Sequence, residues 1–191
     1  MEVLTRSAQL AEFITQARSS GEPVALDMEF ERERTYRPIL QLVQLATRDR
    51  AVIVDPLEIR DLGPLWDLVA DPEVTILFHA GRQDLEIFWH ESGGMIPHNL
   101  IDTQIAAALL GLGEQVGYAD LVRRMLDVHL KKGERTTDWG RRPLSEAQLK
   151  YALDDVLYLH EVGDRLSEQL ESRNRTEWLR EEMEFYSDLG T

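Results

Sequence analysis

Acidic and apolar side chains alternate in the segment Leu26-Asp27-Met28-Glu29-Phe30. In a β-strand successive side chains point to opposite faces, so Asp27 and Glu29 share one face, about 6.5 to 7 Å apart. Two carboxylates held this close in a partly buried place repel each other and lose hydration unless a proton or a metal ion compensates. The pair is therefore a candidate cation site, although a solvated strand face would show the same pattern.

Further candidates for carboxylate chemistry lie later in the chain. Asp84 follows the apolar run 74–78 and the turn His79-Ala80-Gly81, early in a helical pattern, where an Asp is usually a cap or a partner of the helix dipole. Tyr151 and Asp155 are four residues apart in a helical segment, so they lie on one face, one turn apart. Each signal is weak alone, and only their combination indicates a common site.

The elements expected to position these residues are strands first and helices later. Ser145 followed by Gln148 is a capping-box pattern that begins a long helix. The polar, basic stretch 131–142 is longer than a routine connection, and such loops are often functional or mobile. Apolar runs predict strands over 24–30, 39–46, 51–54 and 74–78, the first three as a meander, and helical periodicity predicts helices over 7–18, 62–70, 82–90, 103–110, 118–126, 145–170 and 176–185.

Composition excludes several classes of function. The chain has 191 residues, 35 of them acidic and 21 basic, a formal net charge of −14 and no cysteine. The lack of cysteine excludes disulfides, thiolate zinc sites, iron–sulfur clusters and a cysteine nucleophile. No run reaches the roughly 18 to 20 apolar residues of a membrane span and no signal-peptide pattern begins the chain, so we expect a cytoplasmic protein without a membrane partner. The negative charge disfavours extended binding of nucleic acid but leaves a local site open.

The order and context of these motifs resemble the ribonuclease D family of 3′-to-5′ exonucleases, in the tyrosine-containing branch of the four-carboxylate superfamily. The similarity covers roughly residues 22–161. The helical nucleic-acid-binding domains that follow the catalytic domain in many family members are not recognised, which leaves substrate length and affinity open. The segments that carry the resemblance are 26–30, 78–86 and 151–156, supported by 34–38, 41–45, 101–104, 137–139 and 142–144.

The resemblance implies an α/β fold of the ribonuclease-H-like exonuclease kind, with a mixed central sheet flanked by helices. Residues 1–191 would form one exonuclease domain whose last helices span 162–187. It also implies two divalent cations, Mg²⁺ or Mn²⁺, one activating the attacking water and the other stabilising the leaving oxygen.

Family analogy also assigns a role to each candidate. Asp27 would bridge both ions, Glu29 and Asp155 would complete the site that holds the water, and Asp84 would support the second ion. Tyr151 would orient the water, because an unperturbed phenol titrates near about 10 and is a poor general base at neutral pH.

The implied reaction is hydrolytic release of nucleoside 5′-monophosphates from the 3′ end of single-stranded RNA or short oligonucleotides. A DNA-directed proofreading or repair exonuclease would share every catalytic residue. A metal-free carboxylate enzyme such as a glycosidase would need only two acids, and a non-catalytic binding module would need none of the five key side chains. The sequence leaves the RNA or DNA preference, the metal and the oligomeric state open.

Candidate contacts to a nucleic-acid backbone come from two basic clusters, which a solvated surface would also explain. One cluster follows Glu29. The other surrounds Trp139, which could either anchor its loop or stack on a base. His79, at the end of a strand, is interpreted as a packing and hydrogen-bonding residue. The candidates for phosphate contacts are Arg32, Arg34, Arg37, Lys131, Lys132, Arg135, Arg141 and Arg142.

Overall fold

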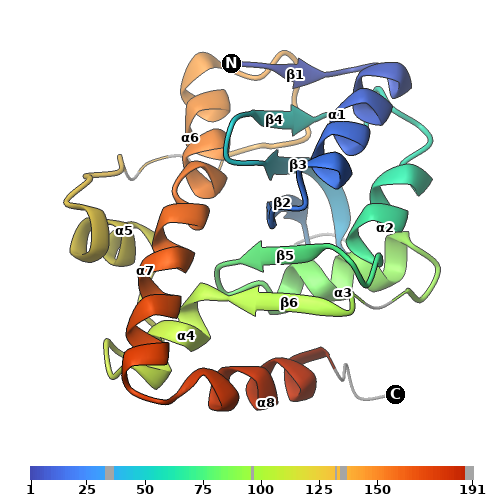
Figure 1. Ribbon diagram of the computed structural model, residues 1–191. Helices are drawn as coiled ribbons and strands as arrows, with labels where there is room; N and C mark the ends of the chain where they lie inside the picture. The colour runs from blue at the N-terminus through green and yellow to red at the C-terminus, as the bar shows by residue number, and fades with distance from the viewer. Residues whose placement is uncertain (33–36, 96, 132, 134–136, 188–191) are drawn as a thin grey trace.

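A six-stranded mixed sheet with the strand order β1-β4-β3-β2-β5-β6 forms the centre of the molecule (Figure 1). This computed structural model describes residues 1–32, 37–95, 97–131, 133 and 137–187. The strands are β1 (Val3–Leu4), β2 (Val24–Glu31), β3 (Ile39–Ala46), β4 (Ala51–Val54), β5 (Thr75–Phe78) and β6 (Asn99–Asp102).

The predicted meander is confirmed, because β3 pairs antiparallel with both β2 and β4. On its other side β2 pairs parallel with β5, so the strand that carries Asp27 and Glu29 is central. The strands β1 and β6 were not predicted from the sequence. Both are short edge strands: β1 has only two residues, and β6 has only two apolar residues between Asn99 and Asp102, so neither forms an apolar run.

The two faces of β2 have different environments. Leu26 and Met28 point into the main hydrophobic core, which also contains Phe13 of α1 and Trp66 of α2. Asp27 and Glu29 therefore point to the opposite face, as the alternation predicted. In Figure 1 α6 and α7 run along one side of the stacked strands, and α1 and α2 lie on the other.

The helices occupy the predicted places, with one correction. The expected single helix over 145–170 is divided at Tyr158, whose backbone N–H instead bonds to the hydroxyl of Tyr118 at 3.2 Å. The division lets α6 contact β2, β3 and β4 while α7 contacts β5, and a continuous apolar period does not reveal such a break. The helices are α1 (Ser7–Ser20), α2 (Gly63–Val69), α3 (Arg82–Glu91), α4 (Thr103–Leu109), α5 (Tyr118–Leu126), α6 (Glu146–Leu157), α7 (Leu159–Ser172) and α8 (Thr176–Ser187).

The start of α6 follows the sequence closely. The Ser145 hydroxyl accepts the backbone N–H of Gln148 at 3.2 Å, and the Gln148 side chain accepts the backbone N–H of Ser145 at 2.9 Å. The predicted capping box is therefore confirmed, and it fixes the helical register of Tyr151 and Asp155. Within the described ranges, no helix combines the length and apolar character needed to cross a lipid bilayer.

Candidate active site

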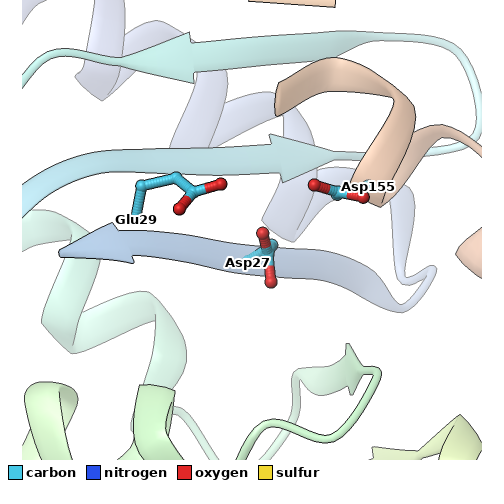
Figure 2. Close-up of side chains that lie close together, drawn as sticks. All are labelled: Asp27, Glu29 and Asp155. Atoms are coloured by element: carbon cyan, nitrogen blue, oxygen red, sulfur yellow. The ribbon is translucent and has the colours of Figure 1, made fainter. Parts of the chain in front are cut away.

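Three carboxylates converge where α6 crosses the face of β2 (Figure 2). Asp27 and Glu29 extend from alternate positions of β2, and Asp155 extends from α6 toward them. One carboxylate oxygen of each residue lies within 4.8 Å of the others, and all three side chains are partly buried. The sequence predicted the pair on one strand, and the packing of α6 adds Asp155 to it.

The surroundings of this cluster favour the neutral forms of the acids. Burial and the nearby carboxylate of Asp155 raise the pKa of Asp27 well above its usual value. Burial and the charge of Asp154 raise the pKa of Asp155 to about 7. Negative charge is therefore costly here unless a cation is present, and a divalent cation would displace the protons.

Asp84 approaches the site from the first turn of α3. Its side chain is 6% exposed, and its Oδ1 atom has no hydrogen-bond partner among the described residues. Burial, followed by the charge of Asp27, raises the pKa of Asp84 well above its usual value. A buried carboxylate oxygen without a partner is unfavourable, so the interpretation as an ordinary helix cap does not account for it. The oxygen fits a cation ligand, direct or through water.

These donors suit a particular class of metal ion. Asp27, Glu29, Asp84 and Asp155 offer only carboxylate oxygens, the hard ligands that Mg²⁺ and Mn²⁺ prefer. The close set of three and the unpartnered Oδ1 of Asp84 are both accounted for if cations bind between them. The residues present therefore fit the metal site that the sequence predicted.

Asp102, which was not among the predicted site residues, holds the turn that leads to Asp84. Its carboxylate accepts backbone N–H groups from Ala80 at 3.0 Å, Gly81 at 2.9 Å and Gln104 at 2.8 Å. Ala80 has a φ of 57°, a left-handed conformation that is unfavourable for a residue with a Cβ atom. An Asp immediately before a predicted helix is an N-cap signal that could have singled out Asp102.

A cavity of about 410 Å³ opens beside the carboxylates. Tyr151 and Asp155 of α6 both line it, as does Asp154. Tyr118 and Lys131 are also on its wall, which places one of the predicted basic residues beside the site. A cavity of this size, next to a cation site, can accept a nucleotide-sized ligand.

His79 also lines this cavity, but both of its ring nitrogens are engaged in the protein. Nδ1 lies 2.9 Å from the hydroxyl oxygen of Thr103, and Nε2 lies 3.0 Å from the carbonyl oxygen of Val116. Burial lowers the pKa of His79. These contacts agree with the interpretation of His79 as a packing and hydrogen-bonding residue.

The loop before α6 is anchored to the sheet. Trp139 is only 5% exposed and packs in a cluster with Leu42, Ile53 and Ala152. Its ring centre lies 6.1 Å from that of Tyr151. The suggestion that Trp139 stacks on a base is therefore wrong, because its ring is covered by protein, and the alternative of a loop anchor is correct.

Arg142 has a similar anchoring position. Its guanidinium donates to both carboxylate oxygens of Asp55, at 2.6 and 2.8 Å, and to the backbone carbonyls of Gln41 and Trp139. Asp55 is only 3% exposed, so this ion pair is largely shielded from water. The suggested phosphate contact from Arg142 is not supported, because its donors are directed at the loop and at β3.

The remaining basic candidates have different surroundings. Lys131 and Arg141 are exposed, and Arg37 is exposed next to β3. Arg32 forms an ion pair with Glu86 of α3. Three further candidates, Arg34, Lys132 and Arg135, lie outside the described residues.

Comparison with known proteins places this site in a family. A family model described as 3′-5′ exonuclease matches residues 1–171. Ribonuclease D of Nitrobacter hamburgensis is 46% identical over 193 residues, covering 100% of this chain and 50% of that protein. Ribonuclease D of Jannaschia sp. is 50% identical over 186 residues, covering 94% of this chain and 47% of that protein. The chain thus spans about half the length of these curated relatives.

Solved structures of related proteins superpose closely on this chain. Escherichia coli RNase D, described as an exoribonuclease involved in structured RNA processing, superposes with a TM-score of 0.92 at 38% identity, covering 97% of this chain and 49% of that one. Brucella melitensis NrnC with bound Mg²⁺ gives 0.76 at 31% identity, covering 87% and 82%. NrnC bound to pGG gives 0.78 at 32% identity, covering 87% and 81%. The predicted α/β exonuclease fold is confirmed, and the chain belongs to the 3′-5′ exonuclease family.

Proposed function

We propose that the chain is a metal-dependent 3′-5′ exoribonuclease that releases nucleoside 5′-monophosphates from the 3′ end of RNA or short oligonucleotides. The observation that carries the proposal is the cluster of Asp27, Glu29 and Asp155, whose carboxylate oxygens lie within 4.8 Å of one another. Asp84 adds a buried oxygen without a hydrogen-bond partner among the described residues. We propose two divalent cations, Mg²⁺ or Mn²⁺, as the cofactors.

The side chains around the cluster have separate tasks. Asp27, Glu29 and Asp155 hold the cations, and Asp84 supports the second one. Bound cations polarise the attacking water and neutralise charge on the scissile phosphate. Tyr151, on the wall of the cavity, orients the water through its hydroxyl, and Lys131 contacts a phosphate of the bound strand.

The related structures and the net charge support the proposed substrate class. NrnC has been solved with pGG and with Mg²⁺, which supports short oligonucleotides as substrates and Mg²⁺ as a cofactor. Because the net charge is −14, the chain has little basic surface for a long polyanion. We infer that residues 1–191 act as one exonuclease unit in the cytoplasm, and that single-stranded DNA is the second candidate substrate.

The test compares substrates and ions in one assay. Purified protein is incubated with 5′-labelled single-stranded RNA, DNA of the same sequence and a dinucleotide, each with Mg²⁺, Mn²⁺ or EDTA. We expect shortening of the RNA from its 3′ end, cleavage of the dinucleotide, and no reaction in EDTA. Faster degradation of DNA would favour the proofreading or repair alternative, and activity in EDTA would contradict the metal mechanism.

Matched variants connect the activity to the cluster. Asp27→Asn and Asp155→Asn each remove one ligand charge, so we expect losses of several orders of magnitude in kcat, of the size seen when essential catalytic groups are removed. Glu161→Gln removes a carboxylate of α7 that pairs with Arg165 in an exposed position, and it is the control. Appreciable turnover by folded Asp155→Asn would refute the assignment.

A further inference from the structure

Gln44 lies on the same face of the sheet as the carboxylates. In the register of the sheet it is opposite Asp27 on β2 and opposite Ile53 on β4. Directly opposed residues of antiparallel strands point to the same face, with Cβ atoms about 4.5 to 5.5 Å apart. The side chain of Gln44 therefore lies beside that of Asp27, beneath α6.

The environment of Gln44 is unusual for an amide. The residue is 0% exposed, and neither Nε2 nor Oε1 has a hydrogen-bond partner among the described residues. Its neighbours on this face of β3 are apolar: Leu42 packs with Ala152 of α6, and Ala46 packs with Val156. A buried amide without partners destabilises a protein, whereas an apolar side chain of the same size would fit without that cost.

We propose that Gln44 is a positioning residue whose Nε2 donates a hydrogen bond to the carboxylate of Asp27 when the cations are bound. The inference rests on the proposed metal site. Asp27 is the acid that register places next to Gln44, and an amide N–H that donates to a ligand carboxylate fixes the direction of its oxygens. This hydrogen bond would satisfy an amide that has no partner among the described residues.

The proposal predicts opposite effects on cation affinity and on folding. Gln44→Met keeps the length of the side chain but removes the amide. We expect its dissociation constant for Mn²⁺, measured by isothermal titration calorimetry, to rise about tenfold or more, the size of effect known for residues that support metal ligands. Its urea midpoint in EDTA should equal or exceed that of the wild type, because the unsatisfied amide is gone.

Two further variants test whether the amide N–H of Gln44 is the group that supports cation binding. Leu42→Met is a volume-conserving change on the same face and strand, so it should bind Mn²⁺ as the wild type does. Gln44→Glu keeps an oxygen but has no N–H donor, and it should also weaken Mn²⁺ binding. Tighter binding by Gln44→Glu would show that the N–H donor is not needed for cation binding and would overturn the donor role.

The outcomes separate this inference from the proposed function. If the wild type binds Mn²⁺ and folded Gln44→Met binds it within about twofold, the amide is structural only and the inference is overturned while the metal site stands. If the wild type binds no Mn²⁺, the metal site itself fails, and the inference fails with it.

Discussion

The carboxylate of Asp102 accepts the backbone N–H of Gly81 at 2.9 Å, three residues before Asp84. This bond connects the end of β6 to the turn between β5 and α3, and a second bond to Ala80 strengthens the connection. A Cβ atom on Gly81 would lie 2.7 Å from the Phe78 side chain, so this position of the turn requires glycine. The position of Asp84 thus depends on an acid that does not belong to the carboxylate cluster.

Replacing Asp102 should therefore affect both stability and catalysis. Asp102→Ala leaves three backbone N–H groups without their acceptor, so we expect a loss of about 2 to 3 kcal/mol in the free energy of unfolding, measured with urea. We expect kcat to fall about tenfold with a smaller change in KM, because Asp84 is displaced. Asp61→Ala is the control, since Asp61 accepts the N–H of Gly63 at an exposed turn. Equal effects of the two variants would contradict the positioning role.

The raised pKa of Asp155 gives the cation-free protein a defined pH dependence. Its pKa is about 7 in the folded state, against a usual value of 3.8. Between these values the folded state holds a proton that the unfolded state has released, so stability falls as pH rises and then levels off above about 7. In EDTA the urea midpoint should decrease from pH 5 to pH 8, and Asp155→Asn should flatten this decrease. If Asp155→Asn had the same pH dependence as the wild type, Asp155 would not be the group that causes it.

Tyr151→Phe tests the hydroxyl on the wall of the cavity. The ring keeps its packing near Trp139, so folding should be unchanged. We expect kcat to fall about 10²-fold, within the range of a positioned proton-handling group, with little change in KM. Steady-state and single-turnover rates on labelled RNA measure this. An unchanged kcat, with the chemical step shown to be rate-limiting, would remove Tyr151 from the mechanism.

Arg142→Ala should destabilise the fold. Removing this guanidinium leaves the buried Asp55 carboxylate without its partner, so we expect a loss of about 3 to 5 kcal/mol in the free energy of unfolding. The matched change is Arg48→Ala, which breaks exposed pairs with Glu22 and Asp164 and should cost less than about 1 kcal/mol. Urea unfolding compares the two. If the two losses were the same, the anchoring role of Arg142 would not hold.

The salt dependence of binding reports how many phosphates the protein contacts. The net charge of −14 stays negative after two divalent cations bind, so few phosphates can be neutralised. For binding of single-stranded RNA by the inactive Asp155→Asn variant, we expect the logarithm of affinity to change with that of salt by about −2 to −3. Replacing Lys131, Lys132 and Arg135 together by Ala should flatten the slope and raise KM more than it lowers kcat. A slope of about −6 or steeper would indicate an extended basic track.

Local patterns in the sequence determined which faces of β2 and α6 carry the candidate site residues and where α6 begins. Alternation in β2 placed Asp27 and Glu29 on one face, because side chains in any strand alternate. Ser145 and Gln148 marked the start of α6, because a capping box needs only residues three apart. The spacing of Tyr151 and Asp155 fixed their common face for the same reason. Such patterns involve residues that are close in the chain, so they can be recognised without knowledge of the tertiary structure.

Tertiary structure decided which elements meet and what becomes buried. The packing of α6 on β2 and β3 brings Asp155 to Asp27, and it also covers Gln44 and Trp139. Asp102 acquires its role only because β6 ends beside the turn before α3. Burial and the carboxylate of Asp155 raise the pKa of Asp27. The ion pair with Asp55 occupies the guanidinium of Arg142, so that group is not directed at a phosphate. Both depend on contacts between segments far apart in the chain, which local periodicity does not encode.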